Sequence, residues 1–145
     1  MISLQSTINK IIAFYNSHLQ VKKVGSDFKE QMTNFATKDE KYPIVFIVPV
    51  SVSNTENTNI FTLDIYCFDI IQKDRANIIT ILSDTHQILM DLYNYFTFSN
   101  DLSMDVSGIP SFTALNNDLL DYAAGYVMTI TLEVSNWTDC DVPLQ

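Results

Sequence analysis

The order of apolar and polar residues in the middle of the chain predicts two strands and a long helix. Residues 41–52 and 59–71 are apolar runs rich in β-branched and aromatic side chains, and a polar segment separates them. Residues 74–98 then carry apolar side chains at three- and four-residue spacings, with Asp74 as the expected N-cap. This order predicts a strand pair followed by a helix that packs on it.

The predicted long helix is apolar on more than one face. Its main stripe is expected to face the sheet and consists of Ile78, Ile79, Leu82, His86, Leu89, Leu92, Tyr93 and Phe96. Ile81, Ile88 and Met90 fall on the opposite face. A helix that is apolar on two sides is either deeply buried or meets a second partner. Ile81 and Ile88 are therefore candidate interface residues.

Both predicted strands have faces that can be assigned from the sequence. The first is apolar on both faces, which is typical of a central strand. Pro49 within it predicts a bulge or an unpaired edge, because proline donates no backbone hydrogen bond. The second strand is expected to turn one set of residues toward the core, namely Phe61, Leu63, Ile65 and Cys67.

The remaining segments complete the expected fold. Residues 3–19 have an amphipathic helical pattern that ends at Leu19 and that Ser3 or Ser6 can cap. Residues 21–35 are predicted as a hairpin with strands at 21–24 and 28–32, and a strand after residue 98 is expected to break at Gly108 and Pro110. Residues 126–134 alternate strictly, as a half-buried strand does. We expect one α+β domain over residues 1–145, with an N-terminal helix and a long helix on a mainly antiparallel sheet, and a polar tail from residue 135.

The charge balance argues against several classes of partner. The chain has 17 acidic and 8 basic residues, a formal net charge of −9. The only compact basic stretch is Lys22-Lys23 and the only arginine is Arg75, so direct binding to a phosphate backbone is disfavoured. No apolar run reaches the ~18 residues of a membrane span, and the N-terminus lacks the pattern of a signal peptide. We expect a protein made in the cytoplasm that does not enter a membrane.

The sequence contains no common catalytic or nucleotide-binding motif. His18 and His86 each sit within a helical pattern, and a structural role is favoured for both. Cys67 is expected in the core and Cys140 in the tail; free thiols are the simpler interpretation, although a disulfide between them stays open. We therefore expect no enzymatic activity and no cofactor.

Carboxylates offer one hypothetical metal site. Asp64 and Asp69 could hold a cation together with Asp118 or Asp121. The sequence supplies neither histidine ligands near them nor the spacing of a calcium loop. Roles in solvent or in pairs across strands are favoured for these side chains, so no metal is expected.

Three stretches carry a resemblance to a known family. They are Tyr42-Pro-Ile-Val, the segment from Thr62 to Ile71 that leads into Asp74–Phe96 of the long helix, and Asp121-Tyr-Ala-Ala-Gly-Tyr continuing to Pro143. In these stretches the chain resembles tail-terminator and neck-ring proteins of tailed bacteriophages, particularly small virion proteins of phages of Bacteroidetes, including crAss-like phages. The resemblance implies a sheet flanked by helices, which agrees with the fold expected above.

The resemblance also implies a role in assembly. Such proteins form rings at the head–tail junction, so we expect a homo-oligomer (hexamer or dodecamer) that contacts neck, portal or tail proteins while DNA passes without specific binding. The location would be the virion. Candidate lumen residues are Asp118 and Asp121, and candidate interface residues are Asn54, Glu56, Asn57, Ile81, Ile88 and Trp137. Alternatives are another tail-completion or adaptor component, or a non-catalytic phage protein that binds a host factor.

Overall fold

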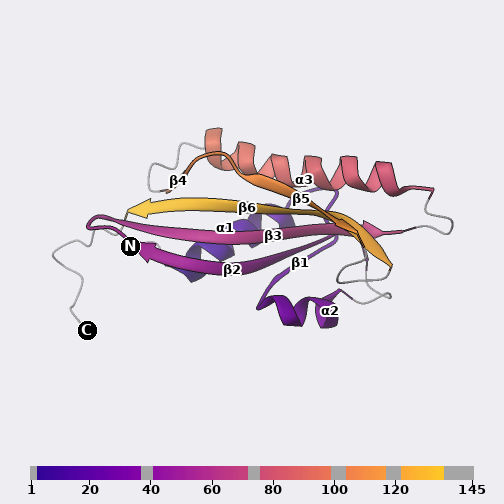
Figure 1. The fold of residues 1–145 in the computed structure, drawn as a ribbon, viewed down its shortest axis with the longest axis horizontal. Coiled ribbons are helices and arrows are strands. Elements are labelled where there is room, and N and C mark those ends of the chain that lie inside the picture. The colour runs from indigo at the N-terminus through magenta and orange to yellow at the C-terminus, as the bar shows by residue number, and fades with distance from the viewer. Residues whose placement is uncertain (1–2, 37–40, 72–75, 99–103, 117–121, 136–145) are drawn as a thin grey trace.

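The computed structural model describes residues 3–36, 41–71, 76–98, 104–116 and 122–135. These residues form one α+β domain with a mainly antiparallel sheet, as predicted (Figure 1). The elements in chain order are α1 (Leu4–Asn16), β1 (Lys23–Ser26), the 3-10 helix η1 (Lys29–Gln31), α2 (Met32–Phe35), β2 (Ile44–Asn54), β3 (Thr58–Ile70), α3 (Ile78–Phe98), β4 (Met104–Val106), β5 (Ser111–Asn116) and β6 (Ala123–Ser135).

The sheet has the strand order β1-β2-β3-β6-β4, and β5 also pairs with β6. The β1–β2 pair is parallel and the other pairs are antiparallel. β2 lies between β1 and β3, as its two apolar faces predicted. The β2–β3 register shifts between Pro49 and Ser51, which confirms the predicted bulge. The predicted break after α3 is also present, because Gly108, with a φ of 70°, lies between β4 and β5.

Each face of the sheet has its own hydrophobic core. α1 and α3 cover one face (Figure 1), where the larger core includes Val45, Ile47, Leu63, Ile65, Cys67, Met128, Ile130, Leu132 and Val134. Met32 and Ala36 cover part of the other face and pack with Ile44, Phe46, Val48, Tyr66 and Phe68. The alternation of β3 and β6 thus places their side chains as predicted. On the second face, β3 and β6 extend past this smaller core and carry polar side chains.

The prediction of a hairpin at residues 21–35 is wrong in its second half. β1 is a strand, but it pairs in parallel with β2, and residues 29–35 are helical. Phe28, Met32 and Phe35 recur at helical spacing, which brings Met32 into the smaller core. The ring of Phe35 lies so close to Gly25 that a Cβ there would be 2.5 Å from it.

The buried face of α3 is shifted relative to the prediction but keeps part of the predicted stripe, namely Leu89, Leu92 and Phe96. Ile81 and Ile88 are 2% and 0% exposed, so they belong to the core and not to an outer face. Ile79 and His86, which were expected in the buried stripe, are exposed. The expected N-cap Asp74 lies outside the described residues.

α1 begins as predicted and ends earlier than predicted. Ser3 caps it and forms a reciprocal capping box with Ser6. The helix ends at Asn16, so Leu19 lies beyond it and is exposed rather than part of the buried face. The end of the helix therefore leaves His18 free to turn toward α3.

Candidate functional site

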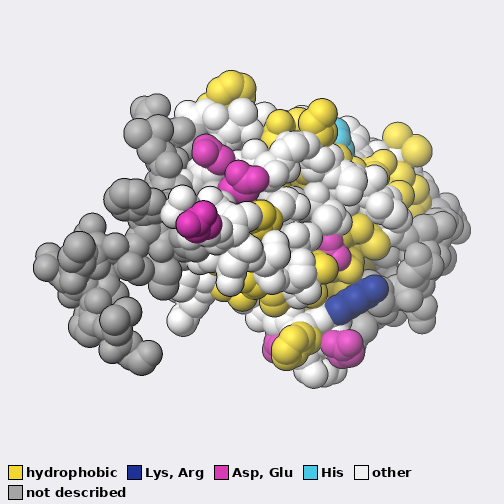
Figure 2. Space-filling model, turned by 60° about the vertical axis from the view of Figure 1, so that its left-hand side comes forward, with side chains coloured by type: hydrophobic (Ala, Val, Ile, Leu, Met, Phe, Trp, Pro, Cys, Tyr) yellow, Lys and Arg dark blue, Asp and Glu magenta, His cyan; other side chains and the backbone are white. Residues whose placement is uncertain are grey.

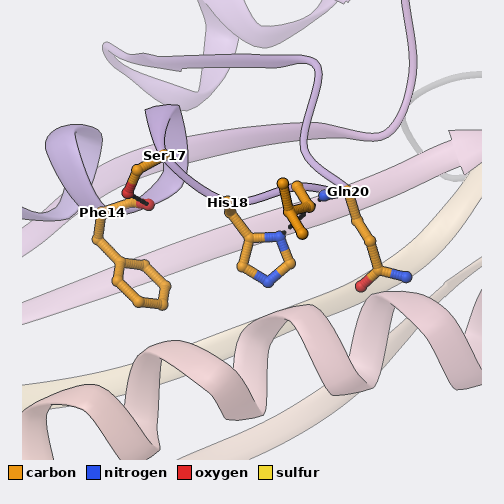
Figure 3. Close-up of a pocket in the computed structure, with 5 residues that line it drawn as sticks. Phe14, Ser17, His18 and Gln20 are labelled. Atoms are coloured by element: carbon orange, nitrogen blue, oxygen red, sulfur yellow. Dashed lines mark hydrogen bonds between the residues drawn. The ribbon is translucent and has the colours of Figure 1, made fainter.

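His18 lines an open pocket beside the end of α1, together with Phe14, Ser17, Leu19 and Gln20 (Figure 3). Its Nε2 lies 2.8 Å from Oδ2 of Asp91 on α3. Its Nδ1 accepts a hydrogen bond of 3.2 Å from the backbone N–H of Gln20. Because Nδ1 is an acceptor, the neutral ring carries its proton on Nε2 and donates it to Asp91. Both ring nitrogens therefore have hydrogen-bond partners within the protein, Asp91 and the backbone of Gln20.

Ser17 stands next to His18 in the sequence but does not form a catalytic pair with it. Its hydroxyl donates to the backbone oxygen of Phe14 at 2.9 Å and lies 3.3 Å from that of Ala13. A nucleophilic serine needs a base that can take its proton, and Nδ1 of His18 is held by Gln20. This arrangement joins the end of α1 to α3, and a structural role for His18 agrees with the prediction.

The other sequence candidates for chemistry are also held in structural contacts. The exposed His86 packs edge-on against Phe112 and Tyr126, with ring centroids 4.8 and 5.8 Å away. Oδ1 of Asp64 accepts a 2.6 Å hydrogen bond from the hydroxyl of Thr129, its register partner on β6. Within the residues that the structure describes, no group of three or more His, Cys, Asp or Glu could hold a metal ion.

Burial suppresses ionisation at three groups near the sheet. It raises the pKa of the Cys67 thiol, and the nearby charge of Asp69 raises it further. It likewise raises the pKa of Tyr15, whose hydroxyl donates to the backbone oxygen of Ile88 at 3.1 Å. The pKa of Asp69 is raised by burial, partly offset by its bond from the Ile70 N–H. Because a thiolate is the reactive form, Cys67 is a poor nucleophile.

The predicted interface residues divide into three groups. Asn54, at the end of β2, and Glu56 and Asn57, in the turn to β3, are exposed. Ile81 and Ile88 are buried in the core under α3, so the structure contradicts their proposed place in an interface. Trp137 lies outside the described residues, as do the predicted lumen residues Asp118 and Asp121.

The structure reveals exposed apolar residues that the sequence interpretation did not select. Val50 and Val52 are 53% and 51% exposed on β2, beyond the point where β1 stops pairing with it. Their alternation with Ser51 and Ser53 resembles that of an ordinary half-buried strand. Among the described residues, this stretch of β2 has no neighbouring strand on its outer side because β1 is shorter than β2. That is a fact of tertiary pairing that local sequence does not contain.

Charge is divided unevenly along the chain. Residues 1–75 contain eight basic and eight acidic residues, whereas residues 76–145 contain nine acidic residues and no Lys or Arg. Asp105 of β4 lies directly opposite Glu133 of β6, and both are exposed. Figure 2 shows acidic side chains close together on the surface, away from a Lys or Arg near its lower edge. A count by halves would have found this signal in the sequence.

Comparisons with known proteins add no family assignment. A scan against models of protein families finds no match, and neither does a search of curated proteins. Among the described residues, no helix is long and apolar enough to cross a membrane.

Proposed function

We propose that this protein is a structural component of the head–tail junction of a tailed bacteriophage, where copies form a ring around the passage for DNA. The proposal begins from the resemblance of three stretches to tail-terminator and neck-ring proteins. These stretches contribute most of β3, α3 and β6 and the start of β2. The three stretches therefore lie mainly in the helix and strands that form the domain and not in scattered loops.

The observation that carries the proposal is the acidic, partly uncovered face of the sheet. α1 and α3 cover the opposite face, while this one presents Thr62, Asp64, Thr129, Thr131 and Glu133 beyond the smaller core. An antiparallel sheet with one packed face and one solvated face is stable as a subunit. A solvated acidic face fits a channel wall that repels DNA.

The opposed carboxylates of Asp105 and Glu133 strengthen this argument. Like charges directly opposite on neighbouring strands destabilise a sheet, by roughly 0.2–1 kcal/mol. Such a pair does nothing for the stability of a lone subunit. It is useful where a polyanion must pass without binding, because the repulsion between carboxylates and phosphates keeps DNA mobile. We assign Asp64, Asp105 and Glu133 to the lumen, in addition to Asp118 and Asp121.

Electron cryo-microscopy of particles of the phage that encodes this chain tests the proposal directly. We expect the chain as a symmetric ring between portal and tail, with the face that carries Asp64 turned toward the axis. Absence of the chain from purified particles would refute the structural role and leave a binding protein directed at a host factor. A ring with the helices α1 and α3 toward the axis would retain the role and reject the lumen assignment.

A charge variant tests the lumen assignment separately. Glu133→Lys combined with Asp105→Lys places cations where the wall is proposed to repel DNA. We expect particles with this variant to assemble but to eject their genome more slowly. The matched control is Asp84→Lys, an exposed acidic residue on α3, which covers the opposite face of the sheet. Equal ejection rates for the two variants would place the lumen elsewhere.

A further inference from the structure

The outer edge of β2 has a stretch to which a further strand can add. β1 pairs only with Ile44–Ile47, and among the described residues no strand pairs with the outer edge of residues 48–54. Val50 and Val52 are exposed there, and residues 48–54 contain no charged side chain. Proteins usually protect such edges with charges, proline or bulges. Pro49 and the bulge limit the open stretch to its last five residues, 50–54.

The directions of the backbone N–H and C=O groups at this edge follow from the hairpin between β2 and β3. The N–H of Thr55 donates to the oxygen of Thr58 at 2.8 Å, so Thr55 faces β3. In an antiparallel pair, residues alternate between bonding to the partner strand and facing away from it. With the registers Val52↔Phe61 and Asn54↔Asn59, the N–H and C=O of Val52 and of Asn54 therefore point to the outer edge.

The opposite edge of the sheet ends in β5, which is also uncharged. Its sequence is Ser-Phe-Thr-Ala-Leu-Asn, and no strand among the described residues pairs with its outer side. The N–H of Ser107 donates to the oxygen of Thr131, so odd-numbered residues of β6 bond toward β4 and β5. Because Ala114 pairs with the even-numbered Tyr126, its N–H and C=O point outward.

The two edges have the correct relative direction to pair with each other. β2 and β6 are both antiparallel to β3, so they run the same way, and β5 runs against them. A second copy turned about an axis along the strands would bring its β5 antiparallel to β2 of the first. The strand addition would then extend the existing antiparallel sheet.

Charge favours this pairing over one between two β5 edges. Residues 22–41, which include β1 and lead into β2, contain five lysines and four acidic residues, whereas β5 belongs to the half of the chain with nine acidic residues and no Lys or Arg. The segment that leads into β2 is thus less acidic than the half of the chain that contains β5. The unequal charge of the two edges favours contact between unlike edges and opposes contact of the acidic edge with itself.

We propose that the β2 edge of one copy pairs with the β5 edge of the next, so that one sheet continues from subunit to subunit. The contact uses two different surfaces and is therefore heterologous, and a rotation that closes makes a ring. This inference names the interface of the proposed ring and rests on the proposed function for its biological setting. The occupant of the β2 edge is a second copy of this chain.

Proline variants test each edge without cutting the sheet within a subunit. Val52→Pro and Ala114→Pro remove an outward N–H, and proline is tolerated at such edge positions. Val52→Thr and Ala114→Ser are the controls, because they keep the N–H. By sedimentation velocity, we expect the natural chain and the controls to form species several times the 16.5 kDa subunit. We expect each proline variant to self-associate at least about tenfold more weakly. Proline removes a backbone hydrogen bond between subunits, and its side chain blocks the close approach of the two strands.

Mixing the two proline variants gives the sharpest result. Val52→Pro keeps an intact β5 edge and Ala114→Pro an intact β2 edge, so the mixture is expected to form dimers and nothing larger. A Val52→Pro variant that abolishes assembly while Ala114→Pro has no effect would show pairing between two β2 edges. A natural chain that stays monomeric up to about 1 mM, weaker than typical specific contacts, would also overturn the inference.

Disulfide trapping covers the case in which a proline variant does not fold. In a Cys140→Ser background, a chain with both Val52→Cys and Ala114→Cys should form a ladder of linked subunits on oxidation. Val52→Cys alone should give no dimer, and a dimer there would contradict the proposal. A ladder from a protein that is absent from phage particles would retain this interface and refute the proposed function. A ring of this chain in the virion, without the disulfide ladder, would retain the proposed function and refute this interface.

Discussion

Replacing Ile88 with alanine tests the shift in the buried face of α3 that distinguishes the structure from the sequence pattern. Ile88 is 0% exposed and belongs to the larger core. The substitution removes about three carbon atoms at ~0.8 kcal/mol each, which gives roughly 2.4 kcal/mol of lost transfer free energy. The cavity left behind adds to this cost, so the expected loss of unfolding free energy is about 2–5 kcal/mol.

Ile79→Ala on the same helix is the matched control. Ile79 is 77% exposed, so the same chemical change should alter the unfolding free energy by no more than about 0.5 kcal/mol. Urea unfolding followed by circular dichroism at 222 nm measures both. For a domain of this length, a loss of about 3 kcal/mol also lowers Tm by roughly 6–12 °C.

The comparison of the two isoleucines has a clear refuting outcome. Equal urea midpoints, or a larger loss for Ile79→Ala, would mean that α3 presents to the sheet the face that the sequence pattern suggested. Ile88 would then be available for an interface. The expected order of stabilities is natural chain and Ile79→Ala together, with Ile88→Ala well below them.

Three further predictions concern buried polar and ionisable groups. Tyr15→Phe removes the buried hydroxyl that donates to the backbone oxygen of Ile88 and should lower the unfolding free energy by about 1 kcal/mol, as measured by urea titration. An unchanged unfolding free energy would contradict a stabilising role for this hydrogen bond. Because burial raises the pKa of Cys67, its thiol should react with a thiol reagent only after unfolding. Fast labelling of the native protein in a Cys140→Ser background would contradict this protection. The stability that the buried thiol contributes should fall as the pH rises above the pKa of the unfolded thiol. Burial and the charge of Asp84 raise the pKa of Asp69, so the charged form is unfavourable and stability should decline as the pH rises through the range between its unfolded and folded pKa values. Asp69→Asn should therefore be more stable than the natural chain at pH 7, with the difference vanishing in acid, and a difference that does not change with pH would reject this cause.

Local sequence predicted the features that depend on a few neighbouring residues. Ser3 caps α1 because its side chain reaches the backbone of a residue one turn away. Pro49 lies at a bulge because proline cannot continue the ladder of hydrogen bonds. The alternation of β3 and β6 placed their core side chains correctly, since one face of each strand meets two helices.

Tertiary structure decided the features that depend on which segments meet. The sequence pattern of α3 has two apolar faces, and contact with α1 and the sheet buried Ile88 from one of them together with Leu89 and Leu92 from the other. Residues 28–35 have helical spacing within a segment that also contains strand formers, and the place for Met32 on the second face of the sheet decided between them.

The candidate surfaces divide in the same way. Composition alone showed an acidic chain without catalytic motifs, because these properties belong to the residues themselves. The open edge of β2 and the opposition of Asp105 to Glu133 arise only when strands distant in the sequence pair with a particular length and register. Strand pairing is non-local, so the sequence by itself determined the elements and their charge, and the folded sheet determined which edges and faces remain available to a partner.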